Sequence, residues 1–153
     1  MFSGCYGSGV FFSSNYGSNW LNRSDGLTNF WVYTLAISGS NLFAGTNGSG
    51  VFLSTTSGNN WTAVNGGLTN PVVYSIAISG TNIFAGTYGG GVVLSTNNGT
   101  NWSAVNGSLS NLNIYSVIIS GSNIFAGTYG GGVFKSTNNG ALWSAVNNNL
   151  TNL

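Results

Sequence analysis

The tetrapeptide Phe-Ala-Gly-Thr occurs at Phe43–Thr46, at Phe84–Thr87 and again at Phe125–Thr128. The step between the copies is 41 residues, and other residues keep it along the whole chain. The glycines and tryptophans that share the step are Gly9, Gly50, Gly91 and Gly132, and Trp20, Trp61, Trp102 and Trp143. Because no insertion or deletion breaks this register, each repeat is one supersecondary unit that buries its apolar faces against its neighbours. The sequence therefore predicts a repeat protein.

Each complete repeat contains four short runs of β-branched and aromatic residues, separated by turn residues. In the third repeat the runs predict strands at Val73–Ile78, Asn82–Thr87, Gly91–Thr96 and Trp102–Asn106. The Gly-Gly and Asn-Gly pairs between these runs are typical of hairpin turns. No segment has the periodicity of a helix. The sequence therefore predicts an all-β fold.

The first predicted strand of the third repeat indicates how the sheets are arranged. Its two alternating sets of side chains are both apolar or small. They are Tyr74, Ile76 and Ile78 on one side, and Val73, Ser75 and Ala77 on the other. This pattern favours a strand covered on both faces, as in a four-stranded sheet packed between two others. A ring of such sheets is a β-propeller, whose blades have about 40 to 50 residues.

The repeat divides one predicted domain, residues 1–153, into the blade units 1–31, 32–72, 73–113 and 114–153. The first unit supplies three of the four strands, so we expect three complete antiparallel blades and a three-stranded partial blade. Closed propellers have about four to eight blades. We therefore expect either that copies of the chain form a homo-oligomer or that the chain is a fragment of a longer propeller.

The turn before the fourth strand carries the spacing Ser-x-x-x-Gly-x-x-Trp in all four repeats, as at Ser95–Trp102. This spacing resembles the Asp-box, or BNR repeat, of sialidase-like β-propellers, where Ser-x-Asp-x-Gly-x-x-Trp occupies the same turn. The resemblance implies a folding element away from the active site, with Trp20, Trp61, Trp102 and Trp143 as packing residues. The box Asp is replaced by Asn15, Thr56, Asn97 and Asn138. Asn can bond its own turn backbone, so we expect the turn to persist. The stretch Gly130–Thr137 also resembles blades of xyloglucan-hydrolase and sortilin-type propellers.

Charge is almost absent from the chain. Arg23, Asp25 and Lys135 are its only formally charged side chains. Such a chain has no long-range field to attract a phosphate backbone or an anionic bilayer, so we expect no nucleic-acid partner. No apolar stretch approaches the roughly 20 residues of a membrane span, so we expect no membrane insertion. The hydrophobic fraction of 42% lies in periodic runs and predicts a folded chain.

An enzyme is not expected, and no catalytic residue is assigned. Glycoside hydrolysis usually needs two flanking carboxyl groups, and Asp25 is the only one among the side chains. The resemblance to sialidases implies an arginine cluster, which this chain lacks. Histidine is absent and Cys5 is the only cysteine, so we expect no metal and no cofactor. The glycine runs, such as Gly89–Gly91, precede strands rather than helices and do not predict a phosphate site.

Aromatic residues on glycine-flanked loops are the positive indication of a binding site. In a propeller, the loop between the second and third strands and the loop leading into each blade lie on one face, opposite the Asp-box turns. This face is predicted to carry Tyr6, Trp31, Asn47, Tyr88 and Tyr129. Aromatic rings among amides and hydroxyls form a neutral surface that can stack on sugar rings. A second interpretation is that the tyrosines only cover the blade ends.

We therefore expect a non-catalytic, extracellular or cell-surface module for recognition or adhesion that binds neutral glycans. One alternative is a purely structural repeat segment of a larger secreted or surface protein, closing a propeller by oligomerisation. A degenerate glycosidase is the third hypothesis. The first residues, Met1–Cys5, lack the basic and apolar regions of a signal peptide.

Overall fold

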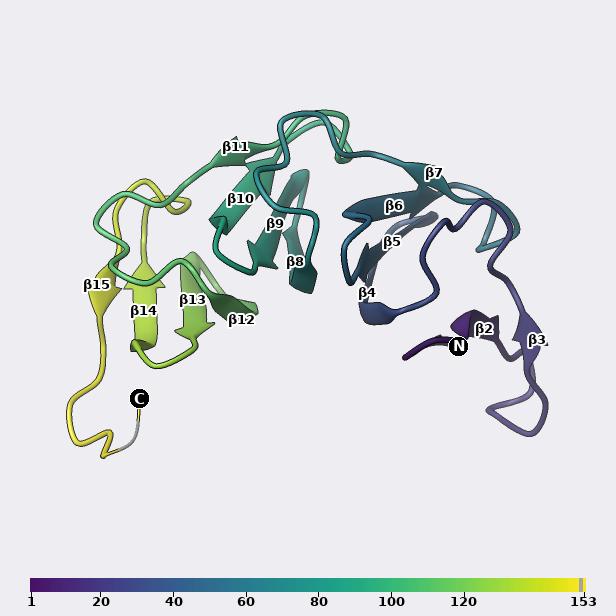
Figure 1. Ribbon diagram of the computed structural model, residues 1–153, viewed down its shortest axis with the longest axis horizontal. Coiled ribbons are helices and arrows are strands. Elements are labelled where there is room, and N and C mark those ends of the chain that lie inside the picture. The colour runs from purple at the N-terminus through teal and green to yellow at the C-terminus, as the bar shows by residue number, and fades with distance from the viewer. Residues whose placement is uncertain (152) are drawn as a thin grey trace.

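Four antiparallel sheets lie side by side along an open arc in the computed structural model, which describes residues 1–151 and 153 (Figure 1). The first sheet has three strands and the other three have four each. Within every sheet the strands follow one another in sequence order, joined by hairpins. In the described part of the chain, no helix is long and apolar enough to cross a membrane.

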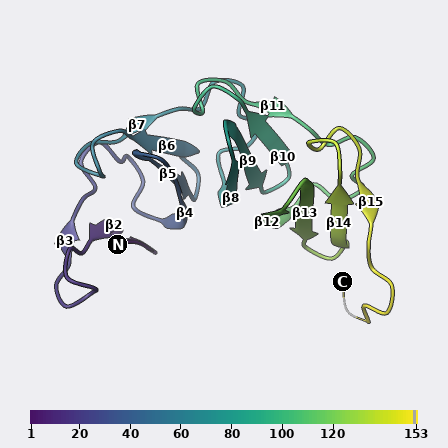
Figure 2. The same cartoon turned by 180° about the vertical axis from the view of Figure 1, so that it is seen from behind.

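Strands that hold the same position in the repeat lie at the same distance from the concave side of the arc. The inner strands lie on the concave side and the short outer strands on the convex rim, as both views show (Figures 1 and 2). The inner strands are β4 (Val32–Ser38), β8 (Val73–Ser79) and β12 (Ile114–Ser120). The second strands are β1 (Phe2–Cys5), β5 (Asn41–Thr46), β9 (Asn82–Thr87) and β13 (Asn123–Thr128). The third strands are β2 (Gly9–Phe12), β6 (Val51–Ser54), β10 (Gly91–Ser95) and β14 (Gly132–Ser136). The outer strands are β3 (Leu21–Asn22), β7 (Thr62–Ala63), β11 (Ser103–Ala104) and β15 (Ser144–Ala145).

The outer strands are shorter than predicted. In the third repeat the prediction was Trp102–Asn106, whereas β11 contains only Ser103 and Ala104. Trp102 leaves the sheet because its backbone N–H donates to Gly66 O of the preceding blade. Asn106 leaves it because its side-chain Oδ1 accepts the backbone N–H of Val92 in β10. Contacts with other segments therefore shorten the outer strand at both ends.

A β-bulge in each inner strand corrects the predicted alternation. In β8 the bulge lies between Val73 and Ser75, so Tyr74 has no pairing partner in β9. Val73 and Ile76 consequently belong to one apolar cluster, although simple alternation placed them on opposite sides. The strand is still covered on both faces, because Ala77 packs against the next cluster. The same bulge occurs in β4 and β12.

The apolar core lies between neighbouring blades, in three clusters. In β9, Ile83 and Ala85 pack toward the preceding blade, and Phe84 packs toward the next one. Gly86 of the repeated tetrapeptide allows this packing, because a Cβ there would lie 2.7 Å from Ile114 Cγ2 of the next inner strand. Each blade therefore depends on its neighbours for burial, as the repeat predicts.

The four box turns share one pattern of hydrogen bonds. Ser95 Oγ accepts the N–H of Gly99 at 2.9 Å and donates to Asn97 Oδ1 at 2.9 Å. Asn97 Oδ1 also accepts the N–H of Asn101 at 2.9 Å. Asn97 Oδ1 thus accepts two hydrogen bonds within the turn. Equivalent bonds at Asn15 and Asn138 have lengths of 2.9 Å, and the Thr56 hydroxyl accepts the corresponding bond at 3.0 Å.

The box tryptophans lie between blades. Trp61, Trp102 and Trp143 are buried, and their side chains belong to the three apolar clusters. Trp20, on the first sheet, is 39% exposed. The difference follows from position, because only Trp20 has no preceding blade among the described residues to cover it.

Candidate functional site

Three tyrosines of the inner strands form the centre of a continuous aromatic row. Tyr33, Tyr74 and Tyr115 are the bulge residues of β4, β8 and β12. The bulge turns each tyrosine out of the strand pairing, so the rings of adjacent blades meet. The ring centroids of Tyr33 and Tyr74 are 5.0 Å apart, and those of Tyr74 and Tyr115 are 4.6 Å apart and stacked. These separations are typical of favourable aromatic pairs.

Loop residues extend this row at both ends and along one side. Trp31 and Tyr6 stack with their centroids 4.7 Å apart, and Tyr6 lies 6.1 Å from Tyr33. Tyr88 meets Tyr74 edge-on at 6.4 Å, and Tyr129 lies 5.6 Å from Tyr115. We call these seven rings the aromatic row: Trp31, Tyr6, Tyr33, Tyr74, Tyr88, Tyr115 and Tyr129.

The structure brings four of the five predicted site residues into the row. Asn47 takes the place of the loop tyrosine in its blade and contributes no ring. Its backbone is held instead, since its N–H donates to Trp31 O at 3.0 Å and its carbonyl accepts from Asn29 Nδ2 at 2.6 Å. Sequence reasoning missed Tyr33, Tyr74 and Tyr115 as site residues. Their recurrence at the 41-residue step was a signal, but Tyr74 was assigned to a packed face.

Asparagine side chains fix the loops that carry the tyrosines. Asn106 Oδ1 accepts the N–H of Val92 at 2.7 Å, and its Nδ2 donates to Gly90 O at 3.0 Å. Gly91, between them, has φ of +76°, and a Cβ there would collide with the Asn106 amide. Only glycine therefore satisfies both the backbone and the space. Asn147 makes the equivalent pair of bonds at 2.7 and 3.1 Å.

A second set of asparagines positions the loops leading into the blades. Asn111 Oδ1 accepts the N–H of Asn113 at 2.9 Å, and its Nδ2 donates to Tyr129 O at 2.8 Å. The loop carrying Tyr129 is thus tied directly to the neighbouring loop. Asn29 ties Trp31 to Asn47 in the same way. The exposed rings therefore stand on loops that are hydrogen-bonded to one another, which limits the entropy lost on ligand binding.

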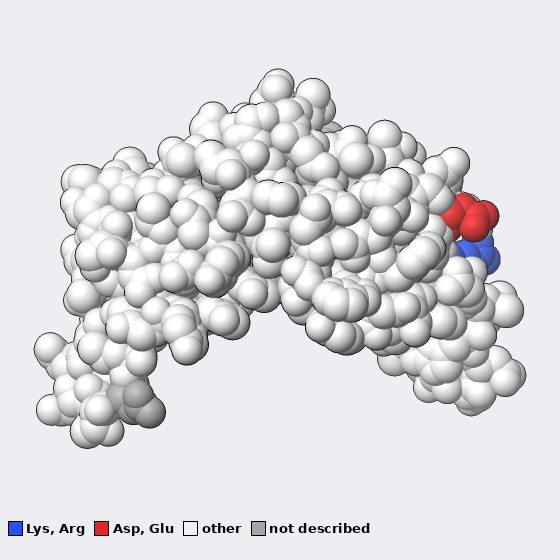
Figure 3. Space-filling view, viewed as in Figure 1, with Lys and Arg blue, Asp and Glu red and all other residues white. Residues whose placement is uncertain are grey.

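The row is electrically neutral. Burial raises the pKa of Tyr33 above its usual value of about 10, and the nearby phenols of Tyr6 and Tyr115 raise it further. Burial, followed by the phenol of Tyr115, raises the pKa of Tyr74. Both phenols are consequently protonated at neutral pH. Figure 3 shows charged side chains only at the edge of the visible face. The site therefore offers ring faces, hydroxyls and amides rather than charges.

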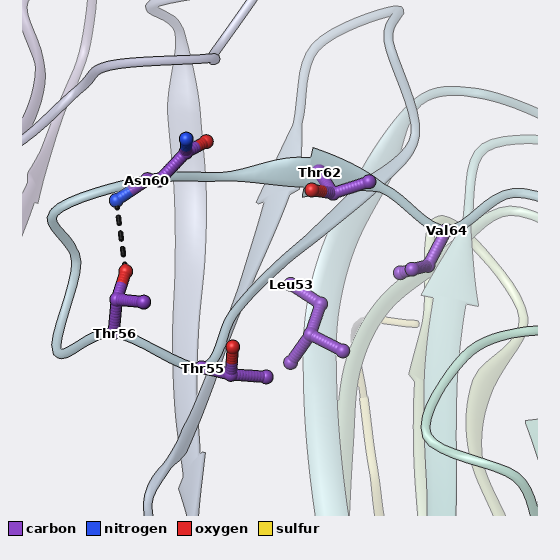
Figure 4. Close-up of a pocket in the computed structure, with 6 residues that line it drawn as sticks. All are labelled: Leu53, Thr55, Thr56, Asn60, Thr62 and Val64. Carbon is purple, nitrogen blue, oxygen red and sulfur yellow. Dashed lines mark hydrogen bonds between the residues drawn. The ribbon is translucent and has the colours of Figure 1, made fainter.

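Surface hollows occur at several places on the described part of the molecule. One, of about 370 Å³, adjoins the row and is lined by Gly7, Thr28, Asn29, Phe30, Trp31 and Asn47. Another, of about 340 Å³, lies between β6, β7 and the box turn and is lined by Leu53, Thr55, Thr56, Asn60, Thr62 and Val64 (Figure 4). Repeat-equivalent residues line a third hollow in the last blade. The two hollows beside box turns thus arise from the repeat itself. Of these three hollows, the one of about 370 Å³ shares a ring, that of Trp31, with the row.

No carboxylate side chain belongs to the aromatic row. Asp25, the chain's one acidic side chain, belongs to the loop between β3 and β4, and its carbonyl accepts the backbone N–H of Trp61 at 2.8 Å. It is thereby attached to the box turn of the next blade. Among the described residues, no group of three or more His, Cys, Asp or Glu side chains could hold a metal ion. The arrangement can bind through stacking and neutral hydrogen bonds.

Comparison with solved structures tests the fold. An ancestral GH74 enzyme superposes with a TM-score of 0.79 and 27% identity, over 95% of this chain and 22% of that one. A GH74 xyloglucanase from Xanthomonas campestris gives a TM-score of 0.72 and 14% identity, over 95% and 28%. The extracellular domain of a candidate one-component system from B. thetaiotaomicron gives 0.71 and 20%, over 96% and 21%.

This chain has a β-propeller fold. The predicted fold class is confirmed by these neighbours, by the all-β structure and by the sheets of three or four antiparallel strands. The chain spans between about a fifth and a third of the length of the structures quoted above. No protein-family model and no curated protein matches its sequence.

Proposed function

We propose that this chain is a non-catalytic, extracellular module for recognition or adhesion that binds neutral glycans along the aromatic row. The observation that carries the proposal is the continuity of seven rings across four blades, on loops and strands that hydrogen bonds hold in place. A glycan chain presents successive flat, apolar sugar faces with hydroxyls at their edges. A row of rings bordered by amides and phenols matches that alternation.

Exposure and energetics favour a ligand that spans several blades. Tyr6, Trp31, Tyr88, Tyr115 and Tyr129 are between 43% and 69% exposed and can meet a ligand without rearrangement. A stacked ring contributes about 1 kcal/mol beyond its buried area. One ring is therefore a weak site, whereas several rings contacting one oligosaccharide act together. The ligand class that fits is an extended neutral oligosaccharide.

The comparisons support the proposal in two respects. One neighbour is a xyloglucanase, whose name states action on a neutral glycan, and another is an extracellular domain. We propose the same kind of ligand and the same side of the membrane for this chain. We also propose that its box turns are Asp-box turns with Asn or Thr in place of Asp, because their side-chain oxygens accept the turn N–H groups.

The absence of catalysis is the part of the proposal that a single variant tests. Asp25 is the only acidic side chain, and usual glycoside hydrolysis needs two carboxyl groups. We expect no release of reducing sugar from a sialoside or a β-glucan by the parent chain. Hydrolysis that disappears in Asp25→Asn would instead establish a degenerate glycosidase.

Binding to xyloglucan oligosaccharides, measured by calorimetry, tests the site itself. We expect Tyr88→Ala combined with Tyr129→Ala to weaken binding roughly 30-fold, because each lost ring is worth about 1 kcal/mol. The fold should stay intact, since both residues lie on loops. Binding should change little with salt, because almost no charge is available for screening. The control is Tyr16→Asn, since Tyr16 is 99% exposed on a box turn, away from the row.

The structural alternative makes the opposite prediction. If the blades are only a scaffold within a larger secreted or surface protein, the parent will bind no neutral glycan on an array. Unaltered affinity in the double variant would equally remove the row from the site. Absence of binding favours the scaffold hypothesis over recognition, and unaltered affinity in the double variant moves recognition to another surface.

A further inference from the structure

Each contact between adjacent blades contains the same tryptophan clamp. The indole N–H and the backbone N–H of one box tryptophan both donate to carbonyl oxygens of the preceding blade. The indole acceptors are Arg23 O for Trp61, Val64 O for Trp102 and Val105 O for Trp143, at 2.7–2.8 Å. The backbone acceptors are Asp25 O, Gly66 O and Gly107 O, at 2.7–2.9 Å. The internal blade contact is thus defined by one donor residue and two acceptors.

On the first sheet, the face that no described blade covers carries a box tryptophan whose N–H groups are unused. We call it the donor face. Trp20 is 39% exposed, whereas the three clamped tryptophans are 2–3% exposed. Within the described residues, neither of its N–H groups has an acceptor. Trp20 lies with Ser3, Cys5 and Phe11 around a largely apolar hollow of about 390 Å³. These positions correspond, one repeat earlier, to residues buried between blades.

On the last sheet, the face that no described blade covers carries the matching carbonyl groups. We call it the acceptor face. Val146 and Asn148 stand one repeat after Val105 and Gly107, whose carbonyls clamp Trp143. Apolar side chains of the same blade are exposed. Ile118, Val146 and Leu150 are 60%, 43% and 47% exposed. The hollow lined by Lys135, Thr137, Asn138, Leu142, Ser144 and Val146 lies on the same blade.

We propose that these two faces bind each other between two copies of this chain, head to tail. Trp20 of one copy donates its indole N–H to Val146 O and its backbone N–H to Asn148 O of the other. Such a contact is heterologous, so it repeats until the arrangement closes. Two copies bring together eight sheets, twice the four of one chain, within the usual range of about four to eight blades. The inference does not rest on glycan binding.

Two polar side chains weaken this contact relative to the internal ones. Ser3 replaces the alanine found at Ala44 and Ala85, and Lys135 replaces the leucine found at Leu53 and Leu94. A lysine can bury its stem and keep its ammonium group in water, so the faces remain compatible. We therefore expect a reversible association, and we expect Lys135→Leu to tighten it.

Sedimentation equilibrium of the 153-residue chain over a concentration series is the direct test. We expect the mass to rise from 15.7 kDa toward about twice that value. Trp20→Ala should abolish the rise, and Trp20→Phe, which keeps a ring but loses the indole N–H, should weaken it. The control is Tyr16→Asn, because the equivalent residues Ser57, Asn98 and Asn139 are exposed even in internal contacts.

The single thiol on the donor face gives a second measurement. Cys5 lines the hollow beside Trp20, so a second copy should slow its alkylation as concentration rises, and the effect should vanish in Trp20→Ala. Circular dichroism shows whether each variant is folded, which separates lost association from lost structure. A parent that stays monomeric at its solubility limit would overturn the proposal. So would self-association that Trp20→Ala leaves unchanged.

Discussion

Glycine in the repeated tetrapeptide is required by contact between blades. Gly86 has an ordinary strand conformation, yet a Cβ there would lie 2.7 Å from Ile114 Cγ2 and 3.0 Å from Val117 Cγ2. Both atoms belong to the next inner strand, which is packed and has little room to move. Gly45 meets Val73 in the same way, at 2.7 Å. The motif that reveals the repeat thus marks the closest approach of one blade to the next.

Gly86→Ala should lower the free energy of unfolding by about 1 to 3 kcal/mol, because an added methyl group overpacks this contact. The matched control is Gly127→Ala, where the added Cβ would meet only the Ser116 side chain. Urea denaturation of both variants measures the difference. Equal losses in the two would show that strand propensity, rather than contact between blades, controls the position.

The four box tryptophans differ in burial, so we expect them to differ in how much they contribute to stability. Trp102→Ala should cost roughly 3 to 5 kcal/mol of stability, because a large buried ring and its bond to Val64 O are lost. Trp20→Ala should cost much less, since Trp20 is partly exposed and has no described partner blade. Thermal melts of dilute samples, which limit association between copies, check this contrast. A Trp102→Ala melt at the parent temperature would contradict it.

At the scale of the element, the blade is a hairpin series stabilised by side-chain clamps. The outer strands have only two paired residues each and could not hold the third strand by themselves. Asn106 accepts the N–H of Val92 in the third strand of its blade and donates to the carbonyl of Gly90, just before that strand. The loop that carries Tyr88 is thereby fixed at its far end. Blade stability and site geometry consequently share the same asparagines.

Asn106→Ala should therefore affect both the stability of the blade and the loop that carries Tyr88. It leaves the buried N–H of Val92 without its acceptor, which should cost about 1 to 3 kcal/mol. It should also speed amide exchange in the β9–β10 loop. Asn106→Asp keeps the acceptor for Val92 but sets a carboxylate oxygen against Gly90 O, so it tests the bond to Gly90 separately from the bond to Val92. Hydrogen exchange followed by mass spectrometry measures the loop, and loop exchange unchanged in Asn106→Ala would contradict the clamp.

At the scale of the whole molecule, the stability of the chain is close to a sum over contacts between blades, as in other repeat proteins. The aromatic row crosses all four blades, so it connects the same units that the apolar clusters connect. Ionisation of Tyr33 or Tyr74 would therefore place a charge where the rings of adjacent blades meet. Histidine is absent, so no imidazole titrates between neutral and mildly acidic pH.

Alkaline pH should destabilise the molecule. The pKa values of Tyr33 and Tyr74 are raised in the folded chain, so above about 10 the unfolded chain loses these protons first. The free energy of unfolding should be constant near neutral pH and fall as pH rises through the folded-state pKa values. Thermal melts across this range test the prediction. Tyr33→Phe with Tyr74→Phe keeps the rings and should reduce the alkaline loss.

Local sequence was sufficient for the repeat, the strand order, the neutral surface and the loop positions of Tyr6, Trp31, Tyr88 and Tyr129. Each of these depends on residue type at a fixed spacing. The bulge that turns Tyr74 into the row was not predictable in this way, because it depends on how β8 pairs with β9. Trp20 and Trp102 likewise share one motif but differ in burial, since burial depends on whether another blade lies against them. Strand pairing and blade contacts join distant segments, so they appear only when the chain is folded.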